Sequence, residues 1–214
     1  MNTQTHVLLA LAALVSSVPA SVDRPRPAVQ RPPWQRARRW LLAGAILGAL
    51  APDATLFLMV GMGKLQGVPD AVIFGLWYRL PLWQGLATVS NSVPLYLAVL
   101  AMAWTVRHRW PRAAAFTLVF ALAALLHALT DLPLHHDDGR PHFWPFSDWV
   151  FVSPVSYWDP AHHGRIWSVI ELALAAATIV ICWRALRHRA WRIVLILLGA
   201  SYAGMAAYWW QAFA

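Results

Sequence analysis

Five long apolar stretches constrain the fold of this chain more than any other feature. They run roughly over residues 40–62, 82–106, 113–131, 166–183 and 193–213. A helix needs about 20 such residues to cross a bilayer, and lipid offers no partner for unpaired backbone groups. Charged residues make up 12% of the chain, against about 25% in soluble domains. The sequence therefore predicts an all-α, polytopic transmembrane helical bundle in which residues 1–214 form a single membrane domain.

The N-terminal stretch, residues 5–20, allows two interpretations. Its apolar part is about 14 residues long, which is short for a span and typical of a signal-peptide core. Val18 and Ala20 offer small residues for cleavage. Residues 1–6, however, contain no Lys or Arg. Cleavage would also leave the arginine-rich segment that follows on the outer side of the membrane. We therefore expect a retained, short or tilted first helix, which gives five to six membrane segments in all.

The distribution of basic residues predicts the orientation of the chain. Thirteen of the seventeen lie in three short segments, residues 24–39, 107–112 and 184–192. The positive-inside rule places such segments in the cytoplasm. Residues 63–81 and 132–165 then face outward, as in a multi-pass protein of a bacterial-type inner (plasma) membrane. This pattern explains the formal charge of +8, and because no binding module accompanies the charge, nucleic acid is not an expected partner.

Residues 21–39 are predicted to form an irregular cytoplasmic connector. Four prolines stand among its arginines, at positions 25, 27, 32 and 33. Proline lacks the backbone N–H and clashes with the preceding turn of a helix. A regular helix is therefore not expected in this segment.

Four ionisable residues interrupt the predicted spans: Asp53, His127, Asp131 and Glu171. Each costs about 2.5–3.5 kcal/mol on insertion scales, so each is expected to have a function or a partner. His127 and Asp131 are four residues apart, which puts them on one face of a helix where both side chains can reach one ion. A buried hydrogen-bonded pair is the alternative interpretation of this spacing.

Residues 132–165, here called the outer loop, hold the densest group of polar side chains. With the first helix spanning the membrane, seven of the nine histidines face outward. Imidazole and carboxylate are the ligands that zinc takes where thiolates are absent, and Cys182 is the only cysteine. A divalent metal, zinc above all, is therefore the expected cofactor, although a solvated turn would explain part of the loop. The candidate ligands are His6, Asp53, His127, Asp131, His135, His136 and His142.

Four motifs together resemble the membrane-bound metal-dependent hydrolases, the YdjM-like family. They are residues 1–6 (Met-Asn-Thr-Gln-Thr-His), residues 47–53 (Leu-Gly-Ala-Leu-Ala-Pro-Asp), His127-x-x-x-Asp131, and residues 143–147 (Phe-Trp-Pro-Phe-Ser). Their order and spacing are similar to that family over much of the chain. Residues 127–135 are also distantly similar to a motif of zinc phospholipase C and the fungal single-strand nucleases.

The resemblance implies a helical fold in which His6, Asp53, His127, Asp131 and a downstream histidine bind metal. The sequence departs from the family at one point, because the His-Arg-Gly-x-Thr-His element is missing between Asp53 and His127. Four histidines of the outer loop could replace the missing ligand: His135, His136, His142 and His162.

The leading functional hypothesis is a membrane-embedded hydrolase that cleaves a phosphoester or a lipid-like ester through a metal-bound water. Glu171 or Asp138 would act as the general base, and membrane lipid is the expected partner. One alternative is a non-catalytic protein that binds metal for a structural, sensing or transport role. Another is that the outer loop serves as a scaffold for a partner subunit. The sequence leaves the oligomeric state open.

Overall fold

The regular elements in a computed structural model, which describes residues 1–17 and 33–213, are all helices. The prediction of an all-α fold is thus confirmed for this part of the chain. The α-helices are α1 (Thr3–Ser17), α2 (Pro33–Leu50), α3 (Ala54–Leu65), α4 (Asp70–Gly75), α5 (Pro81–Ser90), α6 (Val93–Thr105), α7 (Pro111–Asp131), α8 (Gly164–Ala185) and α9 (Arg189–Phe213). The described residues also form the short 3₁₀ helices η3 (Trp77–Arg79), η4 (Leu132–Leu134) and η5 (Pro160–His162).

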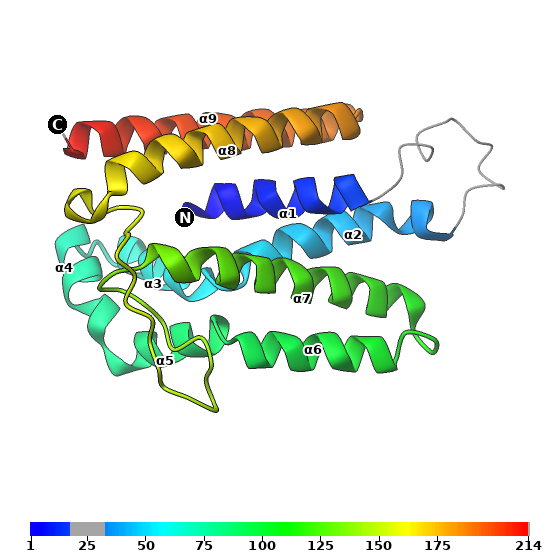
Figure 1. Cartoon of the computed structure of the whole chain (residues 1–214), viewed down its shortest axis with the longest axis horizontal. Helices are drawn as coiled ribbons and strands as arrows, with labels where there is room; N and C mark the ends of the chain where they lie inside the picture. Colours follow the sequence, from blue (N-terminus) through cyan, green and yellow to red (C-terminus); the bar gives the residue numbers. More distant parts are fainter. Residues whose placement is uncertain (18–32, 214) are drawn as a thin grey trace.

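The long helices run side by side, and α1 lies among them (Figure 1). This short helix packs against α2 and α8, with further contacts to α7 and α9. Its Leu8 and Leu11 are fully buried in the largest apolar cluster of the described residues, together with Leu42 of α2 and Leu195 of α9. Helix α1 therefore contributes to the apolar core of the bundle.

Among the residues that the structure describes, two helices, Pro111–Leu134 and Gly164–Ala185, are long and apolar enough to cross a membrane. The number rises to four if each of two bent helix pairs, α2 with α3 and α5 with α6, forms one span. The prediction of five to six segments is therefore not confirmed. Large apolar side chains are exposed along these helices, for example Leu129 of α7 and Val169 of α8, as expected for surfaces that face lipid.

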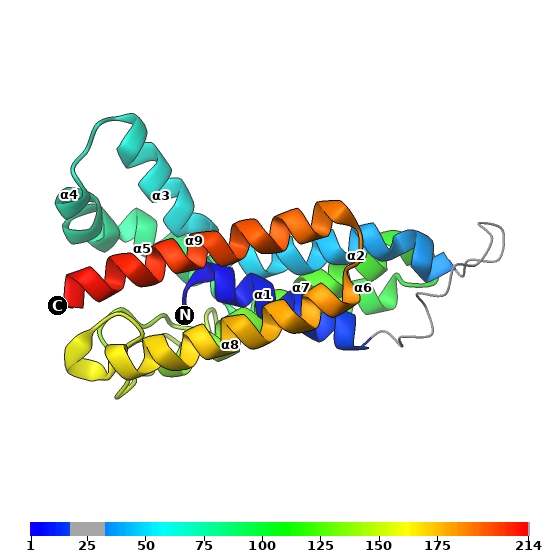
Figure 2. The ribbon, with the colours of Figure 1, turned by 90° about the horizontal axis from the view of Figure 1, so that it is seen from above.

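The two ends of the bundle differ in chemistry. The α6–α7 turn, the α8–α9 turn and the first part of α2 lie at one end, and the outer loop and the start of α1 lie at the other (Figures 1 and 2). The basic residues 107–112 and 184–192 are therefore at the end opposite to the histidines of the outer loop. This separation is what the charge pattern predicts for the two faces of a membrane protein.

The connector proves shorter than predicted, because residues 33–39 belong to α2. Pro33 is the first residue of the helix, a position where proline is tolerated since its missing N–H would have no partner in the helix anyway. The prediction of irregular structure was thus wrong for residues 33–39. Residues 21–32, like the candidate cleavage positions Val18 and Ala20, lie outside the described residues.

Two glycines one turn apart let α2 and α7 approach each other closely. A Cβ atom at Gly48 would lie 2.1 Å from the carbonyl oxygen of Phe120, and one at Gly44 would lie 2.8 Å from that of Phe116. This is the small-xxx-small arrangement by which helices pack in membranes, where close backbone contact replaces the hydrophobic effect. This close contact sets the position of α2 along the axis of α7. It therefore also sets the distance between the Ala49 carbonyl and the His127 ring.

A 70° bend separates α2 from α3 at residues 51–53. Proline at position 52 cannot donate to the helical ladder, so carbonyl groups in the preceding turn lose their usual partners. The side chains of Ser90 and Asn91 donate to the carbonyl of Pro52 at 2.9 and 3.1 Å. The bend leaves Asp53 at the start of α3, near the end of α7.

Candidate metal centre

His127 of α7 has one ring nitrogen fixed and the other buried without a hydrogen bond. Its Nδ1 lies 2.7 Å from the carbonyl oxygen of Ala49, which can only accept, so Nδ1 carries the proton. The side chain is fully buried, and Nε2 has no hydrogen-bond partner. This nitrogen faces Asp131 Oδ2 at 3.6 Å and Asp53 Oδ1 at 3.8 Å. An unsatisfied ring nitrogen thus faces two carboxylates, an arrangement that a cation between them would stabilise.

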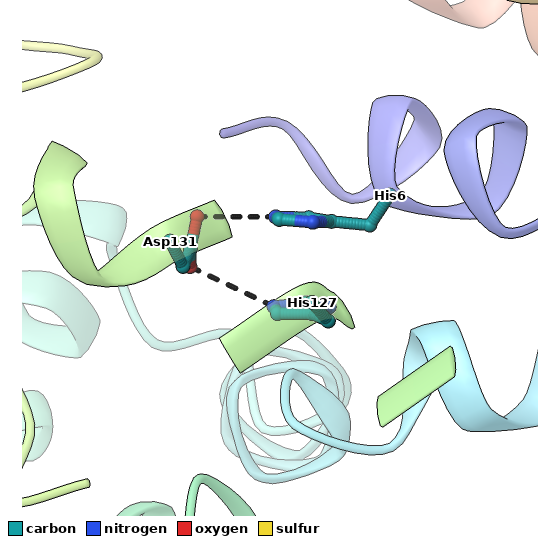
Figure 3. A group of neighbouring side chains, drawn as sticks. All are labelled: His6, His127 and Asp131. Carbon is teal, nitrogen blue, oxygen red and sulfur yellow. Dashed lines mark hydrogen bonds and ion pairs between the residues drawn. The ribbon is translucent and has the colours of Figure 1, made fainter. Parts of the chain in front are cut away.

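Asp131 follows His127 by one helical turn and is the centre of the cluster (Figure 3). Its Oδ1 pairs with the amino group of Met1 and lies 3.1 Å from His6 Nε2. Its Oδ2 lies 2.9 Å from His135 Nε2. The i,i+4 spacing predicted that His127 and Asp131 share a face, and the structure confirms it.

His6 comes from α1 and stacks on His127, with ring centroids 3.6 Å apart and ring planes within 9° of each other. Its Nδ1 lies 3.3 Å from the hydroxyl of Thr130. One ligand atom from each of His6, His127 and Asp131 lies within 4.8 Å of the others, and all three residues are buried. These residues form the group best placed to hold an ion among those described, and we call them the central triad.

Asp53 lies beside the triad rather than within it. Its Oδ1 is 3.8 Å from His127 Nε2, and its Oδ2 accepts a hydrogen bond from the hydroxyl of Thr3. The carboxylate is held at this position by the bend between α2 and α3.

His135 connects the triad to the outer loop. Its Nε2 lies 2.9 Å from Asp131 Oδ2, and its Nδ1 lies 2.8 Å from Asp138 Oδ1. Burial opposes charge on this ring, but the two carboxylates outweigh that effect and raise the pKa of His135 to about 9. The imidazole is therefore protonated at neutral pH and lies between the two carboxylates.

A family model described as YdjM inner membrane protein matches residues 1–212. The chain belongs to this family. No curated protein and no solved structure matches it. The family match confirms the resemblance to the YdjM family and, together with the apolar helices, the prediction that the chain is an inner membrane protein. The hydrolase activity stays a prediction.

Two further predicted ligands of this YdjM family member lie outside the triad. His142 is buried and its Nδ1 lies 2.8 Å from the carbonyl of Arg140. Burial lowers the pKa of His142, so this ring is neutral at physiological pH. His136 points away from His135, and its Nδ1 lies 2.6 Å from the carbonyl of Ser153.

Glu171, one of the two predicted general bases, holds the start of α1 in the bundle. Its carboxylate accepts hydrogen bonds from the backbone N–H of Asn2 at 2.6 Å and from the Thr5 hydroxyl at 2.7 Å. The Asn2 side-chain amide donates to the second oxygen at 3.1 Å. A carboxylate is favoured at this place because the first N–H groups of a helix lack partners and carry partial positive charge. In these contacts Glu171 positions the helix that supplies His6.

Replacing Glu171 with Ala is expected to destabilise the protein by about 1–3 kcal/mol, because three donors at and just before the start of α1 would lose their acceptor, among them the buried hydroxyl of Thr5. Glu171→Gln keeps one acceptor oxygen and should cost less. Thermal unfolding in detergent measures both changes, with Ser17→Ala as a control at the exposed end of the same helix. Equal melting temperatures for Glu171→Ala and the wild type would contradict this role.

Sequence reasoning did not assign roles to three polar residues around the triad. Thr3 donates to Asp53, Thr5 donates to Glu171, and Thr130 contacts His6. Thr3 and Thr5 stand at the polar start of an otherwise apolar helix, and this contrast was the available signal. Thr130 gave no such signal in the sequence. A threonine within an apolar helix commonly bonds to its own backbone, and the Thr130 hydroxyl does donate to the carbonyl of Leu126.

Proposed function

We propose that this YdjM family member is a membrane-embedded, metal-dependent hydrolase whose ion is held by the central triad and Asp53. The observation that carries the proposal is the buried Nε2 of His127, which lacks a hydrogen bond and faces two carboxylates. A buried polar atom without a partner is costly, and native proteins rarely keep one without a reason. Binding of a cation would remove this cost.

The donor set fits zinc. Two imidazoles and one or two carboxylates are a usual ligand set for a catalytic zinc, in which three protein ligands leave a position open. The hydrogen bond from His127 Nδ1 to the Ala49 carbonyl is the kind of outer contact that orients metal-binding histidines. When bound, zinc would supply Lewis-acid chemistry and make water acidic enough to ionise near neutral pH.

The side chains around the triad can hold and move protons. His135 carries a proton between Asp131 Oδ2 and Asp138 Oδ1, so Asp138 is linked to the triad through one imidazole. Asp138 is partly exposed, whereas the oxygens of Glu171 are occupied by donors from α1. We therefore assign the proposed general base to Asp138 rather than to Glu171.

A phosphoester, from a lipid or a lipid-like molecule, is the proposed substrate. The support comes from the distant similarity of residues 127–135 to zinc phospholipases and from the apolar surfaces that surround the site. Exposed apolar side chains lie on α3 and on the outer loop, among them Phe57, Phe146 and Trp149. In the proposed orientation the triad lies toward the outer side of the membrane, and the basic turns are cytoplasmic.

The test is hydrolysis of phosphodiesters, phosphomonoesters and bilayer phospholipids by the purified protein. Activity should disappear with a chelator and return with zinc. Replacing Asp138 with Asn is expected to lower kcat by about 10²–10⁴-fold, as for loss of a general base, while metal content stays unchanged. The proposed reaction is excluded if hydrolysis persists unchanged in both His127→Ala and Asp138→Asn.

The burial of the triad favours a second candidate, a non-catalytic metal site. His6 and His127 are 2% and 1% exposed, so an ion there would have little access to solvent. A structural site would hold metal at one ion per chain and show no hydrolysis of any ester. Metal-dependent stability without activity would therefore support this function over the enzyme.

A further inference from the structure

A second pair of stacked histidines lies in the outer loop, separate from the central triad. His136 and His162 have ring centroids 3.6 Å apart and ring planes 20° apart. The spacing equals that of His6 and His127 in the triad. The two residues come from distant parts of the loop, because His136 follows η4 and His162 ends η5, just before α8.

Each ring of this pair is fixed through its Nδ1. His136 Nδ1 lies 2.6 Å from the carbonyl of Ser153, and His162 Nδ1 lies 2.6 Å from Asp159 Oδ2. Both partners are acceptors, so both Nδ1 atoms carry protons, and Nε2 is the ring nitrogen left to bind a metal. A carboxylate or carbonyl on one nitrogen is what orients histidines that bind metal through the other.

The neighbouring His135 shows the contrast. Its two nitrogens both lie within 3 Å of carboxylates, those of Asp131 and Asp138. His136 points to the opposite side of the same extended segment, since residue 135 has a β conformation. The adjacent residues His135 and His136 thus belong to two different clusters. His135 joins the cluster around Asp131, whereas His136 pairs with His162, and the Nε2 atoms of this pair have no assigned hydrogen bond among the described residues.

The backbone around the pair is held by loop contacts. The N–H of Ser153 donates to the carbonyl of His135, and the N–H of Ser156 donates to the carbonyl of His162. Residues 153–157 therefore tie both histidine segments together. The ring centroids lie 3.6 Å apart, so the two histidines are direct neighbours. Each Nε2 would lie about 2.0–2.1 Å from a shared ion, which requires the stacked rings to tilt so that both lone pairs point at it.

We propose that His136 and His162 form a second metal site, which takes a borderline divalent ion of the Cu²⁺ or Zn²⁺ class. Asp159 orients His162, and water completes the coordination. Imidazole suits these ions, and the one cysteine is buried in α8, far along the chain from both histidines. Both rings are partly exposed, so the ion exchanges with solvent. Bound there, it links the end of α7 to the start of α8 and stiffens the loop beside the triad.

Copper binding in a background without the central triad tests this site. In His127→Ala, we expect one Cu²⁺ per chain, with an electron paramagnetic resonance spectrum that shows coupling to two imidazole nitrogens. Adding His136→Ala or His162→Ala should abolish this signal. Asp159→Asn should weaken Cu²⁺ binding by about 10–100-fold, as for loss of an orienting partner. His163→Asn is the matched control, because His163 is adjacent, exposed and in a left-handed conformation that Asn tolerates.

The result is decided by which histidines carry the copper. If His127→Ala binds no Cu²⁺ while its thermal unfolding stays cooperative, the second site does not exist. If the copper signal survives in both His136→Ala and His162→Ala, the ion is elsewhere and the inference is wrong. In case the His127→Ala background does not fold, His6→Ala removes the other stacked ring of the triad and serves the same purpose. A protein that binds Cu²⁺ at His136 and His162 but hydrolyses no ester would keep this inference and refute the proposed reaction.

Discussion

Replacing His127 with Ala is expected to lower the affinity of the central triad for zinc by more than about 100-fold, above the 10–100-fold that loss of an outer partner costs. The substitution removes the one buried Nε2 that faces both Asp131 and Asp53. It also removes the ring on which His6 stacks. Equilibrium dialysis with zinc, followed by metal analysis of the purified protein, measures the effect.

A chelator extends this test to stability. Any ion that binds only the folded state stabilises it by mass action, by about 2.7 kcal/mol at 100 times Kd. Removing zinc should therefore lower the melting temperature of the wild type but leave that of His127→Ala unchanged. His108→Ala is the control, because His108 is exposed in the α6–α7 turn at the opposite end of the bundle. Equal zinc binding by His127→Ala and His108→Ala would rule out the triad as the metal centre.

The second large effect is expected from Gly48→Ala, which should destabilise the bundle by at least about 1–3 kcal/mol, the usual cost of overpacking. The added Cβ would lie 2.1 Å from the carbonyl oxygen of Phe120, a backbone atom that cannot rotate away. Helix α2 must then move away from α7. The Ala49 carbonyl would move with it, and His127 would lose the hydrogen bond that orients its ring.

Two results are expected for Gly48→Ala. Its melting temperature in detergent should be lower than that of the wild type, and it should bind zinc more weakly. Gly61→Ala is the matched control, because a Cβ there would meet nothing within 4 Å. Alanine at that helical position should be neutral or slightly stabilising. If Gly48→Ala unfolds at the same temperature as Gly61→Ala, the close contact between α2 and α7 does not set the geometry of the site.

The sequence alone determined the features that depend on local physics. Long apolar stretches predict helices because lipid leaves backbone groups no other partners. The charge pattern separated the basic turns from the histidine-rich loop, and the bundle has them at opposite ends. Helical periodicity placed His127 and Asp131 on one face. Each of these conclusions depends only on residues that are close in the sequence, and none depends on how the helices pack.

The tertiary structure decided what depends on packing between distant helices. Only the position of α1 at the centre of the bundle brings His6 onto His127, 121 positions later in the chain. The bend at Pro52 brings Asp53 beside them and supplies the Ala49 carbonyl that fixes the His127 ring. Glu171 was predicted as a base, yet its oxygens hold α1. Sequence spacing carries no information on such contacts, because the height and rotation of one helix against another are set by side-chain packing.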